Sequence, residues 1–97
     1  MDIEQMQSNA GDALKLLKAL ANESRLFILC HLVEGELTVS QLNERVPLSQ
    51  SALSQHLAWL RKDNLVTTRK QAQTIYYSLA SDEAKAVLET LHGLYCK

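Results

Sequence analysis

The sequence predicts a mainly α-helical fold with one small antiparallel β-hairpin, in the form of a winged helix-turn-helix that carries an extra helix at each end. Three observations predict it: two short helical segments separated by a break at 47–49, a following stretch with the period-two pattern of strands, and leucine-rich helical stripes near both ends. The 97 residues have the size of one domain, so we expect a single domain over 1–97.

The composition is that of an ordinary folded protein. Apolar residues make up 46% and charged residues 22%, with three Gly and one Pro, which excludes a disordered tail or a repeat array. No apolar run approaches the roughly 20 residues needed to span a bilayer, and the start of the chain lacks the basic and apolar regions of a signal peptide. We therefore expect a cytoplasmic protein with no membrane partner.

Helical periodicity predicts two helices before the helix-turn-helix. The first spans about 3–21, with leucines at 14, 17 and 20, and Ile3 and Met6 extend its apolar stripe. Asn22 caps the second helix, which Gly35 ends. Its positions i, i+3, i+4 and i+7 are Leu26, Leu29, Cys30 and Val33, so we expect Cys30 to face the interior.

Capping signals place the helix-turn-helix at about 38–63. Thr38 and Gln41 form a capping box for a helix over 39–46, which Pro47 ends, and Ser49 caps the next helix. Hydrophobic staples join Leu37 to Leu42 and Leu48 to Leu53. Asn64 can take the left-handed conformation that ends this second helix.

The pattern changes to period two after Asn64. Residues 65–70 and 74–79 are rich in β-branched and aromatic side chains, and the polar stretch 71–73 between them indicates a hairpin, the wing, over about 65–79. Because the turn contains no Gly, its type stays open. Ser81 opens a last helix over about 82–96, whose apolar face consists of Ala84, Val87, Leu88, Leu91 and Leu94.

The charge is unevenly distributed along the chain. The formal net charge is −1, but residues 1–48 carry −3 and residues 80–97 carry −1, whereas residues 49–79 carry +3. The basic side chains of this central third are Arg61, Lys62, Arg69 and Lys70. A locally basic segment in an otherwise acidic chain indicates a surface for a polyanion.

The helix over 50–63 has the composition of a DNA-reading helix. Its leucines at 53, 57 and 60 face the core, which turns Ser51, Ser54, Gln55, Ala58 and Lys62 outward. Gln can pair with adenine, Ser can contact either type of base edge, and short side chains permit close approach in a major groove. The four basic residues are then candidate phosphate contacts. The alternative is a dimeric winged-helix module that binds no DNA and whose polar helix face is simply solvated. The basic wing argues against this alternative.

Two further side chains of this helix have more than one possible role. His56 lies between the outward face and the Leu57 side, where it can hydrogen-bond a phosphate or brace the two helices. Trp59 is expected to be a partly buried packing residue rather than a platform for base stacking.

Two stretches resemble the ArsR-type winged-helix repressors of bacteria. Residues 21–29 (ANESRLFIL) are similar to the second-helix signature of the family, and residues 48–60 (LSQSALSQHLAWL) to its recognition helix. The resemblance implies a homodimer that joins its end helices, about 3–21 and 82–96, and reads an inverted repeat in double-stranded DNA. The leucines at 14, 17, 20, 91 and 94 fit such an interface independently. The candidate DNA-binding residues are Gln50, Ser51, Ser54, Gln55, His56, Arg61, Lys62, Arg69, Lys70, Gln71 and Gln73.

Many members of this family release DNA when a metal binds, but this sequence lacks both family metal sites. One family site uses two cysteines as metal ligands. In the corresponding stretch of this sequence, residues 36–42, Thr38 and Ser40 stand at those two positions, and hydroxyls do not hold soft metals. The second site needs two pairs of ligands on the last helix, of which only Asp82 and His92 are present. We expect no metal and no cofactor.

The two cysteines resemble the dithiol subgroup of the family, the sensors of reactive sulfur species and oxidants, which includes the haemolysin-gene activators of vibrios. Cys30 in ILCHL and Cys96 in LHGLYC match its thiols, and the wing stretch 69–74 is also similar. Taken singly, Cys30 is an ordinary core residue and Cys96 an incidental thiol. The resemblance implies that these two thiols sense oxidants or reactive sulfur. Our hypothesis for the mechanism is that reduced protein binds DNA, whereas a bond between the two residues, direct or through sulfur, releases it.

Two other effector hypotheses stay open: a metal site built from Cys30, Cys96 and His31 or His92, and a regulator with no effector. An enzyme is not expected. The three histidines are scattered at 31, 56 and 92, and the sequence has neither a nucleophile motif nor a glycine loop for phosphate.

Overall fold

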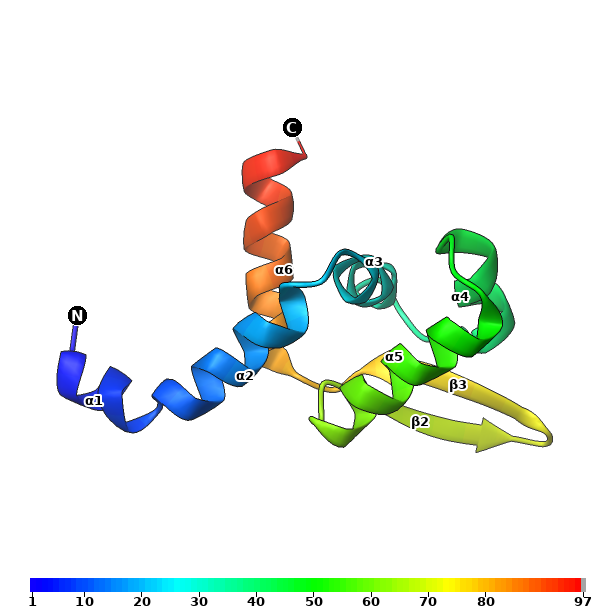
Figure 1. Ribbon diagram of the computed structural model, residues 1–97, viewed down its shortest axis with the longest axis horizontal. Coiled ribbons are helices and arrows are strands. Elements are labelled where there is room, and N and C mark those ends of the chain that lie inside the picture. The colour runs from blue at the N-terminus through cyan, green and yellow to red at the C-terminus, as the bar shows by residue number, and fades with distance from the viewer. Residues whose placement is uncertain (97) are drawn as a thin grey trace.

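The computed structural model describes residues 1–96, which form six helices and one three-stranded antiparallel sheet (Figure 1). In chain order the elements are α1 (Ile3–Ser8), α2 (Ala10–Leu20), α3 (Glu23–Leu32), β1 (Leu37–Thr38), α4 (Val39–Arg45), α5 (Gln50–Lys62), β2 (Val66–Gln71), β3 (Thr74–Leu79) and α6 (Asp82–Tyr95). The N-terminal helices and the hairpin extend in opposite directions from the body of the molecule (Figure 1). The predicted winged helix-turn-helix with an additional helical segment at each end is confirmed. No helix in the described part of the chain has the length and apolar character that a membrane span requires.

The continuous first helix expected over 3–21 is wrong, because the chain breaks it into α1 and α2 at Asn9. This residue has φ −105° and ψ 7°, outside helical geometry. Two side chains at the break bond backbone carbonyls one turn earlier: Ser8 Oγ donates to Glu4 O at 3.2 Å and Asn9 Nδ2 donates to Gln5 O at 3.0 Å. Ser and Asn side chains that compete in this way for backbone groups disfavour a helix interior.

The core-facing side of α3 matches the predicted one in part: Leu29 is buried, and Leu26 and Val33 pack against the core. Ile28, Leu29 and Leu32 are buried, whereas Cys30 is exposed, so the expectation that Cys30 faces the interior is wrong. Residues 26–29 are four consecutive apolar side chains, which gives the helix no clear apolar stripe. Packing against the sheet and α5, rather than sequence period, therefore selects the buried side.

Arg25 at the start of α3 joins three helices. Its Nε donates to the Ala19 carbonyl at 3.0 Å and its Nη2 to the Lys18 carbonyl at 2.9 Å, which satisfies carbonyls at the end of α2. The guanidinium carbon lies 4.2 Å from the centroid of the Trp59 ring on α5. Arg25 thus links the end of α2 to α5. Trp59 packs on the Arg25 guanidinium, but it is exposed and lies outside the buried core, where the sequence predicted partial burial.

The caps of the helix-turn-helix are those the sequence predicted. Thr38 and Gln41 form a reciprocal capping box on α4, and Ser49 accepts from the Ala52 amide at 3.1 Å on α5. The α5 leucines 53, 57 and 60 are buried in the core. A hydrogen bond that was not predicted holds the turn between the two helices: Asn43 Nδ2 donates to the Leu48 carbonyl at 2.7 Å.

The sheet has one strand more than the predicted hairpin. Leu37 pairs with Tyr77 and Thr38 with Tyr76, which gives the order β1-β3-β2. Two residues are too few for a period-two pattern to show in the sequence. The hairpin turn is also shorter than expected: Gln71 pairs with Thr74, which leaves Ala72, with φ 56°, and Gln73 as the turn.

Candidate nucleic-acid interface and thiol pair

The outward face of α5 carries short polar side chains. Because the three leucines of α5 point into the core, Ser51, Ser54, Gln55 and Ala58 are exposed, and Gln50 is exposed at the first turn. His56 is half-buried at the border between the two faces. Short side chains with hydrogen-bonding groups let a helix approach base edges closely.

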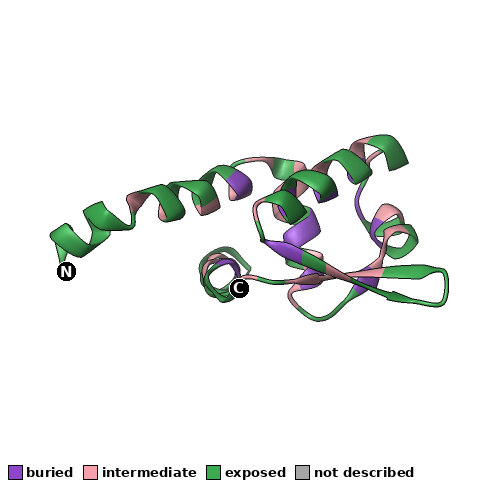
Figure 2. Ribbon diagram, turned by 90° about the horizontal axis from the view of Figure 1, so that it is seen from below, coloured by how far each residue is buried: buried purple, intermediate pink, exposed green. Residues whose placement is uncertain are grey.

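The basic candidates occupy two places. Arg61 and Lys62 are exposed in the last turn of α5. Arg69 and Lys70 follow each other on β2, so their side chains leave opposite faces of the sheet. Gln71 and Gln73 are exposed at the end of the hairpin, whose tip is exposed throughout (Figure 2). The structure thus brings the α5 candidates together on one face and divides the wing candidates between two.

Arg69 is already bound to another side chain. Its Nε donates to Glu36 Oε2 at 2.8 Å, and its Nη2 donates to Glu36 Oε1. Its Nη1 donates to Gln71 Oε1 at 2.9 Å, and its guanidinium lies 4.4 Å from the centroid of the Tyr76 ring. The hydrogen bonds from Arg69 lower the pKa of Glu36. Glu36 is not among the site residues predicted from the sequence, because only the pairing of β1 with β3 brings it near Arg69.

The two thiols are free and exposed in the described chain. Cys30 borders a groove of about 320 Å³ between α3 and α6, which is also lined by Val33, Glu34, Leu88, Glu89, His92 and Gly93. Partial burial in this groove raises the pKa of the Cys30 thiol, and the nearby Cys96 raises it further. Cys30 and Cys96 are therefore electrostatic neighbours, although 66 positions separate them in sequence.

This neighbourhood predicts how Cys30 reacts. The thiolate is the reactive form, and both causes disfavour it, so alkylation of Cys30 by iodoacetamide should need a higher pH than an ordinary cysteine does. Removing the Cys96 charge by Cys96→Ser should move the reactivity profile of Cys30 to lower pH. Mass spectrometry of the Cys30 peptide across pH measures both effects. An unchanged profile in Cys96→Ser would show that the two thiols do not interact.

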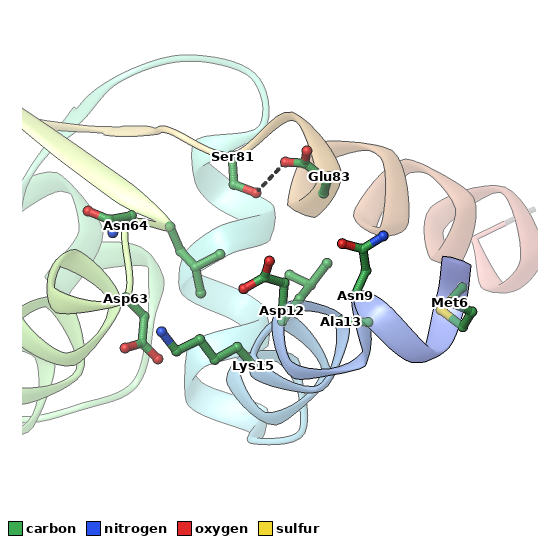
Figure 3. Close-up of a pocket in the computed structure, with 11 residues that line it drawn as sticks. Met6, Asn9, Asp12, Ala13, Lys15, Asp63, Asn64, Ser81 and Glu83 are labelled. Atoms are coloured by element: carbon green, nitrogen blue, oxygen red, sulfur yellow. Dashed lines mark hydrogen bonds between the residues drawn. The ribbon is translucent and has the colours of Figure 1, made fainter. Parts of the chain in front are cut away.

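A second hollow of about 590 Å³ lies between the N-terminal helices, the α5–β2 turn and the start of α6 (Figure 3). Its charged lining is mixed, with Asp12 and Lys15 from α2, Asp63 after α5 and Glu83 from α6. Among residues 1–96, no three His, Cys, Asp or Glu side chains are placed to hold a metal ion.

The end helices leave apolar side chains uncovered. Half or more of each of these side chains is exposed: Ile3, Met6, Leu14, Leu17, Leu94 and Tyr95. The N-terminal arm that carries four of them is exposed along most of its length (Figure 2). Concentrated apolar exposure on protruding helices is typical of a surface that another protein covers.

A helix-turn-helix whose second helix presents short polar side chains beside a β-hairpin defines a DNA-binding protein of the winged-helix class. Residues 22–68 match the family model described as bacterial regulatory protein, arsR family. The whole chain is 59% identical over 97 residues to the transcriptional activator HlyU of Vibrio cholerae, of which it covers 90%. The chain belongs to the ArsR family and is a DNA-binding transcriptional regulator.

Solved structures agree with this assignment. Reduced HlyU from Vibrio cholerae N16961 superposes with a TM-score of 0.90 at 60% identity, over 97% of this chain and 99% of that chain. The transcriptional repressor BigR from Xylella fastidiosa superposes with a TM-score of 0.93 at 35% identity, over 100% of this chain and 99% of that chain. Both are similar in fold across nearly all of this chain.

Proposed function

We propose that this regulator binds an inverted-repeat operator as a homodimer, through the outward face of α5 and the wing, and that Cys30 and Cys96 control its affinity. The main support for the proposed DNA interface is that Ser51, Ser54 and Gln55 are exposed on one side of α5, while buried leucines anchor its opposite side. A helix fixed in this way can enter a major groove without rearranging its core.

The dimer follows from the uncovered apolar side chains on α2 and α6. A chain of 97 residues cannot bury both of these helices against its own small core. Pairing two copies through them would cover the leucines and present two α5 helices to half-sites about 34 Å apart.

The thiol control rests on the neighbourhood of Cys30 and Cys96. An oxidant such as hydrogen peroxide takes two electrons and two protons from the two thiols, which form a disulfide, while the peroxide becomes two water molecules. A polysulfide can instead join them through a short sulfur chain: one thiolate attacks the polysulfide and breaks one of its S–S bonds, the second thiolate attacks the resulting persulfide chain, and the displaced sulfur leaves as hydrosulfide, so the polysulfide is the two-electron oxidant. One of the similar solved structures is of HlyU in its reduced form.

Such a bond would act on the DNA interface through the helices that carry the thiols. Cys96 follows α6, an end helix of the proposed dimer, and Cys30 lies on α3, which leads through β1 into the helix-turn-helix. Fixing the end of α6 to α3 would therefore change the angle between the dimer contact and α5. Reduced protein binds and bonded protein releases DNA in this proposal.

Operator affinity of α5 variants tests the DNA interface. Gln55→Ala should weaken binding of DNA from upstream of the gene by about 30-fold or more, because each base contact contributes about 1–3 kcal/mol and a dimer loses two of them. Lys62→Gln should weaken specific and non-specific binding alike and should flatten the salt dependence. Lys85→Gln on α6 removes an exposed lysine that is not among the proposed DNA-binding residues and should change neither. Fluorescence anisotropy at several salt concentrations measures all three, and wild-type affinity in Gln55→Ala and Lys62→Gln would refute the interface.

A further inference from the structure

Arg69 lies across the whole width of the sheet. The register pairs Arg69 on β2 with Tyr76 on β3, and Tyr76 with Thr38 on β1, so the three residues form one row. Residues directly opposite one another in an antiparallel sheet point to the same face. The guanidinium passes over the Tyr76 ring and reaches Glu36, which immediately precedes β1.

The hydrogen bonds of this guanidinium are largely used within the protein. Nε and Nη2 donate to the two carboxylate oxygens of Glu36, and Nη1 donates to Gln71. Tyr76 covers one face of the group. To bind Arg69, a phosphate would have to displace Glu36 or approach an Arg69–Glu36 pair whose charges cancel. This geometry opposes the phosphate contact that the sequence predicted for Arg69.

Lys70 is not engaged in this way. It is exposed on the other face of β2, and it takes no part in the ion pair between Arg69 and Glu36 that the structure shows within residues 1–96. The positive charge that this part of the wing can offer to a phosphate is therefore that of Lys70.

We propose that Arg69 is a positioning residue, which joins the wing to the start of the helix-turn-helix through Glu36, and that it does not contact DNA phosphate. The inference rests on the DNA interface proposed above. Glu36 lies two residues before Thr38, the N-cap of α4, so the pair connects the middle of the hairpin to the helix that precedes α5. Beyond Arg69 the hairpin tip is exposed, and this connection sets the direction in which the tip leaves the body (Figure 2).

Glu36→Gln separates the two roles by the direction of its effect. If Arg69 positions the wing, the variant loses the ion pair and binds operator about two- to fivefold more weakly, the range of an exposed ion pair. If Arg69 contacts phosphate, removing its acidic partner frees it and binding becomes tighter. The tighter result would overturn the proposal.

The salt dependence of binding gives an independent readout. Arg69→Gln should weaken binding but leave the slope of log affinity against log salt unchanged. Lys70→Gln should reduce the magnitude of this slope by about two, because each lost phosphate contact changes it by roughly 0.9 and a dimer loses two contacts. A similar loss of slope in Arg69→Gln would overturn the proposal. The double variant Glu36→Arg with Arg69→Glu should recover affinity lost in Arg69→Glu, and failure to recover would also overturn it.

Two controls keep these outcomes interpretable. Urea unfolding of each variant confirms that it is folded before its affinity is compared. Gln55→Ala, measured beside them, tests the α5 interface alone, so its failure to weaken binding would refute the proposed function, whereas an unexpected result confined to positions 36 and 69 would refute only the role of Arg69.

Discussion

Placing glutamate at both Leu17 and Leu94 is expected to separate the dimer and to abolish tight operator binding. The two side chains come from α2 and α6 and are 55% and 58% exposed in the single chain. A carboxylate buried in an apolar interface without a partner strongly opposes association. Since joining two binding modules increases affinity by about 10² to 10⁴, the monomer should lose affinity in that range.

Sedimentation equilibrium measures the association of these variants, and anisotropy measures their operator affinity. The matched control places methionine at both positions, which keeps apolar side chains of similar volume and should preserve the dimer. Because neither side chain is buried in the monomer, the glutamates should leave its fold intact, and circular dichroism checks this. A dimer of wild-type strength in the double glutamate variant would contradict the proposed interface.

Bonding Cys30 to Cys96 is expected to lower operator affinity by about 5- to 150-fold. Coupling between two sites of a protein is typically worth about 1–3 kcal/mol, which corresponds to this range. Hydrogen peroxide or a polysulfide should release wild-type protein from DNA, and a reductant should restore binding. Mass spectrometry under non-reducing conditions identifies the bond in the same samples.

Single-thiol variants separate the proposed switch from general oxidative damage. Cys30→Ser and Cys96→Ser should bind operator as reduced wild type does and should keep binding after treatment, because neither can form the bond. Zinc or arsenite should leave wild-type affinity unchanged if the thiols do not form a metal sensor. Treated wild-type protein that carries the bond and still binds with full affinity would contradict the switch.

The sequence predicted those parts of the fold that depend on short-range chemistry. The caps at Asn22, Thr38, Ser49 and Ser81 are all present, since each needs only a polar side chain and an amide three residues later. The buried leucines of α5 were also predicted, because polar neighbours define the apolar side of that helix clearly.

The predictions that were wrong needed information about packing or register. Cys30 lies on a helix with a run of four apolar residues, where the neighbouring elements choose the buried side. The break at Asn9 arises from local side-chain bonds that a leucine stripe hides. Glu36 meets Arg69 only because β1 pairs with β3, and a two-residue strand leaves no pattern in the sequence.

Hydroxyl-radical footprinting of the reduced protein on the DNA upstream of its gene shows whether two copies of α5 read DNA through their Ser and Gln side chains. We expect two protected patches about 34 Å apart, one for each half-site. Both patches should disappear at the same protein concentration when Ser54 and Gln55 are replaced by alanine. A single patch, or two patches that persist in the alanine variant, would show that α5 does not read the operator in this way.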